Sequence, residues 1–185
     1  MIQPDTVNPG IGLALSGGAV RGIAHIAVLE VLELEGIPIQ GIAGTSAGSS
    51  IGALYAVGMT LSEIRRIALQ TNWENILKLT IPKRGIISSE SIYRFMNEIL
   101  PIKKFSALSL PYAAVATDLR TGEKVSITTG SIAKAVQASC SLPIIFTPME
   151  LNKRMLVDGG ISSQIPVKTA REELGVKRVI SVNVN

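Results

Sequence analysis

The sequence predicts an α/β domain in which helices cover both faces of a mainly parallel sheet. Short apolar runs of strand length alternate along the chain with segments whose apolar residues recur at helical spacing. The 185 residues are 46% hydrophobic and 17% charged, which is enough apolar material for one core and excludes an intrinsically disordered chain. Because the sequence contains no linker, repeat or low-complexity tract, residues 1–185 are expected to form one domain, with a core over about residues 11–184.

Apolar spacing and glycines define the elements of the first half of the chain. In chain order we expect a strand over 11–16 that ends at two glycines, a helix over 22–35, a strand over 37–43, a helix of small residues over 47–57 and a helix over 60–70. Thr60 and Glu63 have the spacing of a capping box at the start of the last helix. Residues 71–87 have no clear period and are expected to be a connection.

The second half contains shorter elements, bounded by proline, serine and glycine. In chain order we expect a helix over about 88–100, a strand over 111–117, a returning strand over 124–128, a helix over 130–138, a strand over 155–157, a helix over 167–174 and a strand over 178–184. Apolar residues between 59 and 110 are expected to form either a lid facing a membrane or ordinary core packing. These are Met59, Leu61, Ile64, Ile76, Leu77, Leu79 and Ile81.

Composition excludes several classes of function. One Cys and one His cannot make a disulfide framework or a structural zinc site. The net charge is +4, and residues 83–185 hold most of the basic groups, which suits either a solvated surface or contact with an anionic membrane. Seven aromatic residues and no nucleic-acid motif argue against a nucleic-acid partner. The N-terminus does not resemble a signal peptide, so we expect a cytoplasmic protein, with peripheral membrane contact left open.

The uncharged stretch over residues 36–62 is long enough to cross a membrane, but six backbone-breaking residues interrupt it. We therefore interpret it as a buried strand, a turn and a helix.

The glycine-rich segment near the N-terminus does not match the known nucleotide-binding motifs. Gly12 to Gly17 and Gly17 to Gly22 have P-loop spacing without the lysine, and Ala19 interrupts a dinucleotide fingerprint.

The segment 44–48 (GTSAG) matches the G-x-S-x-G pattern of a nucleophile elbow, between a predicted strand and a predicted helix. A serine on such a turn is held in a strained conformation, and Gly44 and Gly48 leave room for neighbouring backbone. Ser46 is therefore the candidate nucleophile. Its usual partner would be a histidine, but the only histidine, His25, precedes it, opposite to the order of the α/β-hydrolase triad. We expect His25 to be a structural helix residue.

An aspartate could replace the histidine, and the chain has three. Asp5 lies in a polar tail and Asp118 in a turn where aspartate commonly caps amides. Asp158 follows an apolar strand and precedes Gly159-Gly160, which suits a partly buried carboxylate with a raised pKa.

The loop over residues 16–22 (SGGAVRG) is the candidate oxyanion hole, because its small residues can expose backbone amide groups to an oxyanion. Arg21 would steady this loop or attract an anionic head group.

Together these motifs resemble the patatin-like phospholipase family, and the resemblance covers nearly the whole chain. It rests on the ordered series of the loop 17–22, Ala24-His25-Ile26, the elbow 44–48 and the segment 158–160. Secondary matches are Ala116 to Leu119, Ala138-Ser139 with Pro143 and Phe146, and Val179 to Val182.

The resemblance implies a three-layer α/β/α fold and hydrolysis of lipid acyl esters by a Ser46–Asp158 dyad, with no metal or other cofactor. The amides of Gly17, Gly18 and Ala19 would form the oxyanion hole. The chain has Ala19 where the family often has a third glycine, and Gln164 where it often has asparagine. Many relatives run longer, so we expect either a fragment or the loss of a C-terminal extension.

Two other functions remain open at this point: a generic short-chain carboxylesterase or thioesterase, and a catalytically silent, membrane-associated regulatory module. The sequence assigns no head group, positional preference or oligomeric state.

Overall fold

The computed structural model describes residues 10–70 and 87–185. Its described strands are β1 (Ile11–Leu15), β2 (Ile39–Thr45), β3 (Tyr112–Asp118), β4 (Lys124–Ile127), β5 (Met149–Leu151), β6 (Arg154–Asp158) and β7 (Val179–Val182). Its described α-helices are α1 (Ala24–Leu34), α2 (Ala47–Ala56), α3 (Leu61–Gln70), α5 (Glu90–Ile99), α6 (Ile132–Ser139) and α7 (Val167–Glu172). Short 3-10 helices are η1 (Ala19–Ile23), η2 (Phe105–Ala107) and η3 (Gly159–Ile161).

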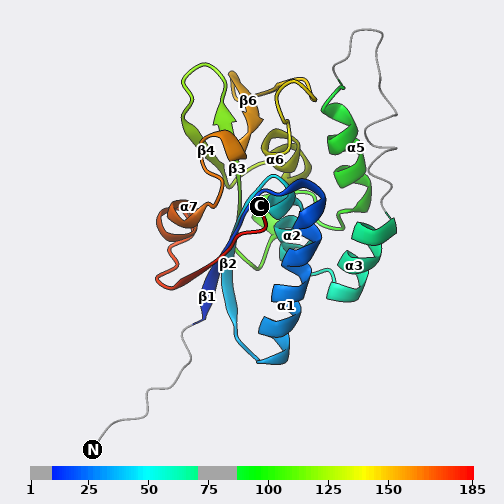
Figure 1. The fold of residues 1–185 in the computed structure, drawn as a ribbon, viewed down its shortest axis with the longest axis vertical. Helices are drawn as coiled ribbons and strands as arrows, with labels where there is room; N and C mark the ends of the chain where they lie inside the picture. The colour runs from blue at the N-terminus through cyan, green and yellow to red at the C-terminus, as the bar shows by residue number, and fades with distance from the viewer. Residues whose placement is uncertain (1–9, 71–86) are drawn as a thin grey trace, which may run out of the picture.

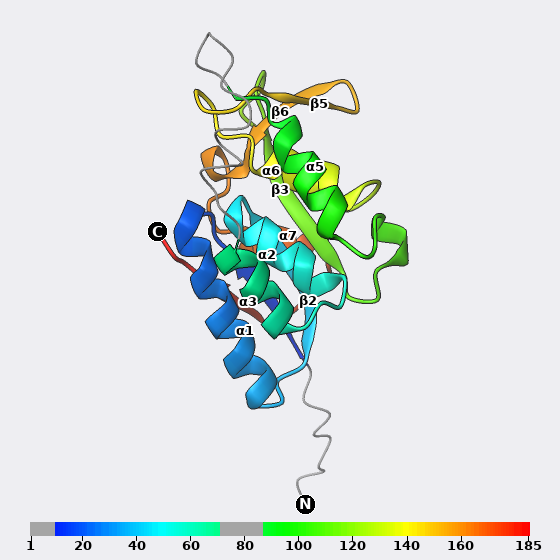
Figure 2. The ribbon, with the colours of Figure 1, turned by 90° about the vertical axis from the view of Figure 1, so that its right-hand side faces the viewer.

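These strands form one seven-stranded sheet, joined by the pairings β5-β6, β6-β3, β3-β2, β2-β1 and β1-β7, with β4 also paired to β3. The four strands β7, β1, β2 and β3 are parallel, whereas β4, β5 and β6 are joined by antiparallel pairs. Helices α1, α2, α3, α5 and α6 lie on one side of the sheet and α7 lies on the other (Figures 1 and 2). The expected three-layer α/β fold with parallel central strands is confirmed.

The central parallel strands β1, β2 and β3 are buried on both faces along most of their length, which explains their largely apolar sequences, whereas β7 exposes Ile180 and Ser181. Leu13, Leu15, Ile42 and Val115 are fully buried. The face toward α7 is lined by small side chains, including Ala43 and Ala113 packed near Ala170. Small residues there let a short helix lie close to the sheet.

One detail of strand pairing determines where the site forms. The segment Ala114 to Thr117 of β3 pairs with β4 along one edge, so β2 and β6 must both lie along the other edge. Strand β2 ends with Thr45 opposite Val115, and β6 arrives from the opposite direction and ends with Asp158 opposite Ala116. The carboxyl ends of β2 and β6 therefore meet beside β3.

Most expected elements are confirmed, with shifts of a few residues at their ends. Strand β2 begins and ends two residues later than expected, and Ser131 caps α6, where its side chain accepts a hydrogen bond from the Lys134 N–H. The Thr60–Glu63 capping box is present, because each residue accepts a hydrogen bond from the other's backbone N–H. No sequence pattern predicted β5, which has only three residues.

Several expectations concern residues outside the described ranges, namely the polar tail with Asp5, the connection over 71–86 and the apolar residues 76 to 81. Among the described members of the apolar stretch that begins at Met59, Leu61 and Ile64 are buried in the core, as ordinary packing requires. No helix in residues 10–70 or 87–185 combines the length and apolar character that crossing a membrane requires.

Candidate active site

Ser46 occupies a sharp turn between β2 and α2. Its backbone angles are φ 51° and ψ −121°, a left-handed conformation that costs a non-glycine residue about 1–3 kcal/mol. The turn exists because the chain must pass from the end of a buried strand into a helix that begins at the next residue. Its carbonyl accepts hydrogen bonds from the N–H groups of Ser49 (2.9 Å) and Ser50 (3.1 Å), so Ser46 also caps α2. The strained serine expected from the G-x-S-x-G pattern is thus present.

The two glycines of the pattern are required by close backbone packing. A Cβ at Gly48 would lie 2.5 Å from the Ser16 carbonyl oxygen and closer still to that of Leu15. A Cβ at Gly44 would lie 2.5 Å from the Ser49 Cα. The elbow therefore sits directly against the end of β1, where the glycine-rich loop begins.

Asp158 lies beside Ser46, because β2 and β6 end at the same point of β3. The Asp158 side chain is 4% exposed and lies near enough to the Ser46 hydroxyl for that group to lower its pKa. Its Oδ1 accepts a hydrogen bond from the Gly160 N–H at 2.7 Å. Burial raises the pKa of Asp158 above its ordinary value, while the Ser46 hydroxyl and the Gly160 N–H oppose that rise. A buried carboxylate with a raised pKa, in contact with a serine hydroxyl, can accept the hydroxyl proton.

Backbone contacts hold the Asp158 segment in place. The Asp158 N–H donates to the Ser141 carbonyl at 2.9 Å, and the Asp158 carbonyl accepts from the Thr117 hydroxyl at 2.9 Å. The Thr45 hydroxyl, one residue before the nucleophile, donates to the Ser163 carbonyl at 2.8 Å. The loop that follows Asp158 is therefore tied to both β3 and the elbow.

The glycine-rich loop lies on the other side of Ser46. A Cβ at Gly17 would be 3.4 Å from the Ser46 Cβ, so the loop passes directly beside Ser46. The Gly17 N–H donates to the Gln164 carbonyl at 3.3 Å. Within the described residues the amides of Gly18 and Ala19 have no hydrogen-bond acceptor. These two N–H groups are therefore free to bind an oxyanion. The Gly17 N–H could bind one only if its hydrogen bond to the Gln164 carbonyl were shared or broken.

Ala19 has a left-handed backbone, with φ 47°. We expect Ala19→Gly to stabilise the protein by up to about 1 kcal/mol, because the left-handed conformation costs alanine about 1–2 kcal/mol and glycine gives back part of that through its freer unfolded chain. A thermal melt should show a rise of about 2–4 °C. The matched control is Ala24→Gly, at φ −65°, which should lower the midpoint instead. A fall for both variants would contradict the interpretation.

His25 is buried and takes a structural role, as expected. Its Nε2 lies 2.9 Å from the Ser16 carbonyl oxygen, which can only accept, so Nε2 carries the proton. Nδ1 has no partner among the described residues. Burial lowers the pKa of His25, and the hydrogen bond to Ser16 partly offsets this effect. The imidazole is therefore neutral and fixes the peptide at the start of the glycine-rich loop.

Arg21 lies beside the glycine-rich loop, and Asp118 lies at the turn that follows β3. The Arg21 side chain is exposed in η1, beside the glycine-rich loop. Asp118 caps the turn after β3, since its Oδ1 accepts hydrogen bonds from the N–H groups of Arg120 (2.9 Å) and Thr121 (3.4 Å). Its Oδ2 lies 4.0 Å from Arg154 Nε. The expected capping role of Asp118 is confirmed.

Ser139, at the end of α6, is hydrogen-bonded to the backbone of the elbow. The sequence pattern predicted no function for Ser139. Its fully buried hydroxyl accepts a hydrogen bond from the Ser46 N–H at 2.9 Å and donates to the Val115 carbonyl at 2.6 Å. Ser139 thus links the strained serine to the point of β3 where β2 ends. The sequence signals were the secondary family match at Ala138-Ser139 and a run of small residues at the end of an apolar helix, and neither indicated a contact with the elbow.

We expect Ser139→Ala to lower kcat by about 100-fold with a small change in KM, because the elbow loses the group that fixes its orientation. It should also reduce stability by about 1–3 kcal/mol by leaving buried backbone groups unpaired. Ser141→Ala is the matched control, because Ser141 is equally buried but its hydroxyl donates to the Gln137 carbonyl and not to the elbow. Steady-state kinetics and melts of both variants test this, and an equal loss of kcat in the two would refute it.

Cys140 is the other nucleophilic side chain nearby. Its sulfur lies 3.5 Å from the Ser50 hydroxyl and 3.8 Å from that of Ser49. Burial, and then the charge of Asp158, raise the pKa of the Cys140 thiol to about 12. A protonated thiol is a poor nucleophile, so Cys140 does not compete with Ser46 at neutral pH.

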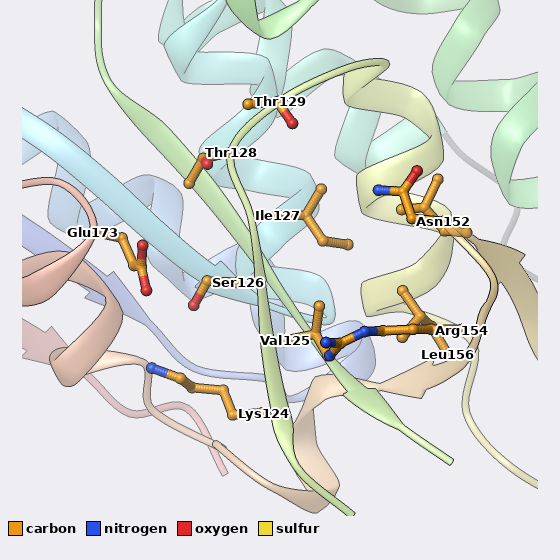
Figure 3. Close-up of a pocket in the computed structure, with 11 residues that line it drawn as sticks. Lys124, Val125, Ser126, Ile127, Thr128, Thr129, Asn152, Arg154, Leu156 and Glu173 are labelled. Atoms are coloured by element: carbon orange, nitrogen blue, oxygen red, sulfur yellow. The ribbon is translucent and has the colours of Figure 1, made fainter. Parts of the chain in front are cut away.

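An open pocket of about 390 Å³ lies elsewhere, along β4 (Figure 3). Residues of β4 and the following turn line it together with Leu151, Asn152, Arg154, Leu156 and Glu173. The lining residues include neither Ser46 nor Asp158. Residues 10–70 and 87–185 contain no group of three or more His, Cys, Asp or Glu side chains that could hold a metal ion.

Comparisons with known proteins agree with the motifs. The family model described as patatin-like phospholipase matches residues 13–171. An uncharacterised NTE family protein of Mycobacterium tuberculosis is 37% identical over 163 residues, which is 86% of this chain and 45% of the relative. The human patatin-like phospholipase domain-containing protein 6 is 34% identical over 182 residues, 94% of this chain and 13% of the relative. The chain therefore spans less than half the length of these relatives.

A solved structure shares the fold at low sequence identity. VipD of Legionella pneumophila superposes with a TM-score of 0.75 at 16% identity, over 94% of this chain and 49% of VipD. At that identity the likeness concerns the fold alone. The family model covers most of the chain, including the elbow and the segment with Asp158. The chain belongs to the patatin-like phospholipase family.

Proposed function

We propose that this protein is a serine lipid acyl hydrolase, a phospholipase or lysophospholipase-like esterase that uses a Ser46–Asp158 dyad and no metal. The observation that carries the proposal is the position of the buried Asp158 beside the strained Ser46, which results because β2 and β6 end at adjacent residues of β3. Family membership supports the lipid substrate, and one relative, 30% identical over 183 residues, is described as a lysophospholipase of Candida albicans.

In the proposed first step, Asp158 takes the proton of the Ser46 hydroxyl while the oxygen attacks the ester carbonyl. The free amides of Gly18 and Ala19, joined by Gly17 if it leaves Gln164, stabilise the oxyanion, and one donor of this kind contributes about 3–4 kcal/mol. The carbon–oxygen ester bond breaks, and the alcohol leaves with the proton that Asp158 held. The fatty acyl group stays on Ser46.

The second step mirrors the first. Asp158 removes a proton from water, and the resulting hydroxide attacks the acyl-enzyme carbonyl. The fatty acid is released as Ser46 recovers its proton from Asp158. Peripheral contact with a membrane would deliver the substrate, and the chain's basic second half is compatible with it.

A fluorophosphonate probe tests the nucleophile directly. We expect the native protein to be labelled, and Ser46→Ala and heat-denatured protein to stay unlabelled, because only the folded dyad activates the hydroxyl. A native protein that resists labelling would favour the silent, membrane-associated module. Labelling of Ser46→Ala would place the nucleophile elsewhere.

A panel of esters then separates the two enzyme functions. Hydrolysis of long-chain lysophospholipids and phospholipids supports the lipid hydrolase. Activity confined to short water-soluble esters or thioesters would indicate a generic carboxylesterase or thioesterase and would overturn the lipid assignment.

A further inference from the structure

Exposed apolar side chains are concentrated around Ser46. Twelve large apolar side chains are exposed in the described residues, and six of them lie on three short segments. These six, which we call the apolar rim, are Val20, Ile23, Leu142, Ile144, Ile145 and Ile161. Single exposed apolar residues are ordinary, but a gathering of them around one site marks an interaction surface.

The three segments meet at the candidate active site. Val20 and Ile23 belong to η1, directly after the oxyanion loop, and Ile161 closes η3, directly after Asp158. The Asp158 N–H donates to the Ser141 carbonyl, one residue before Leu142. The Gly17 N–H donates to the Gln164 carbonyl, in the loop that follows Ile161. The segments that carry the rim are therefore joined to one another beside Ser46.

Ile144 is a strongly exposed member of the apolar rim that also has an unfavourable backbone conformation. Its side chain is 89% exposed, and its backbone has φ 74°. A β-branched residue is rarely found in this conformation because its side chain clashes with the backbone. Neither stability nor solubility explains an isoleucine at this position, because asparagine or glycine would satisfy both better.

The charge of the same segments indicates what covers them. Residues 17–24, 139–146 and 159–166 contain one charged side chain, the exposed cation of Arg21, and no carboxylate. An apolar surface with a cation and without acidic groups suits a bilayer that contains anionic lipids, which would repel carboxylates and attract Arg21.

We infer that the apolar rim docks on an anionic lipid bilayer, with Ile144 and Ile161 entering the acyl layer and Arg21 meeting the head groups. This inference rests on the proposed lipid hydrolase function and names the surface that brings Ser46 to its substrate. Docking in this orientation brings the ester to Ser46 without full exposure of its acyl chains to water.

Vesicle co-sedimentation of Ser46→Ala protein tests the inference without turnover. In that background, Ile144→Asn and Ile161→Asn should each weaken partitioning onto phosphatidylcholine–phosphatidylserine vesicles by about tenfold. Asparagine suits position 144 because it tolerates a positive φ. The matched control is Leu34→Asn, because Leu34 is 83% exposed at the end of α1 farthest from η1 (Figure 1) and should leave partitioning unchanged. Arg21→Gln should weaken binding about fivefold on these vesicles and little on pure phosphatidylcholine.

Equal vesicle binding by the Ser46→Ala protein with and without the rim substitutions, or an equal loss of binding in Leu34→Asn, would overturn the inference. Loss of self-association in rim variants, with vesicle binding unchanged, would assign the rim to a protein contact and would also overturn it. Melts of each variant report whether it folds. If the Ser46→Ala protein does not bind vesicles while the native protein is labelled by the fluorophosphonate, the docking inference fails and the hydrolase function stands. If the Ser46→Ala protein binds vesicles while the native protein is not labelled, the hydrolase function fails.

Discussion

Asp158→Asn should abolish most turnover and leave a protein at least as stable as the native one. Turnover should fall by about 10³–10⁴-fold, because asparagine cannot accept the Ser46 proton. The stability follows from burial. Since the folded protein raises the pKa of Asp158, the charged form is disfavoured on folding, and its destabilising effect appears as pH rises through the folded pKa. Asparagine carries no charge and keeps an oxygen for the Gly160 N–H. Thermal melts at neutral pH, together with kcat/KM, test both parts.

Asp118→Asn provides the matched control. Asp118 is as buried as Asp158, but its oxygens cap a turn and lie near Arg154. Its replacement should lower the melting midpoint and preserve kcat. The opposite pattern for the two variants would transfer the base to Asp118. In the native protein, the acidic limb of the kcat/KM profile should lie above 3.8, the ordinary pKa of aspartate, because the base must be deprotonated.

Gly48→Ala should destabilise the protein by about 3 kcal/mol or more and eliminate labelling of Ser46. The added Cβ on α2 would collide with the carbonyl groups of Leu15 and Ser16 at the end of β1. Backbone atoms cannot move aside as a flexible side chain can. The gain in helix propensity, about 1 kcal/mol, does not offset this collision. Thermal unfolding and fluorophosphonate labelling of the purified variant measure the two effects.

Gly52→Ala, one turn later on α2, is the comparison. Its Cβ would meet the Ile42 Cγ2 at 2.9 Å, a methyl group on a buried β-branched side chain that can shift but has little rotamer freedom. We expect a smaller destabilisation than for Gly48→Ala, about 1–2 kcal/mol, and normal labelling. If the two alanine variants behave alike, close backbone approach is not what requires Gly48.

Sequence patterns predicted most of the fold because each carries its own physical cause. Uninterrupted apolar runs are buried strands, and small residues on α2 allow it to pack tightly, so both were recognisable. The short strand β5 was not, since three residues, one of them a glutamate, have no period to detect. Element ends were displaced by a few residues because caps such as Ser131 are decided by local hydrogen bonds.

The candidate site also includes residues that the sequence indicated and residues whose roles depend on the tertiary structure. Ser46 was identifiable because its strain has a local requirement for glycines at fixed spacing, and His25 could be set aside by its position in the chain. Asp158 was a candidate on local grounds, but its nearness to Ser46 depends on β2 and β6 ending at the same point of β3. The role of Ser139 depends on a hydrogen bond to a residue 93 positions away in the chain.

The sequence by itself determined the alternation of strands and helices, the elbow and the absence of a histidine in position to act as base. Only the tertiary structure decided that an aspartate from a distant strand lies beside the serine, that the Gly17 amide is hydrogen-bonded to Gln164, and that segments next to the site expose isoleucine side chains. The reason is that spacing along the chain controls local backbone geometry. Burial, and the pKa shifts that burial causes, depend on which distant segments the sheet brings together.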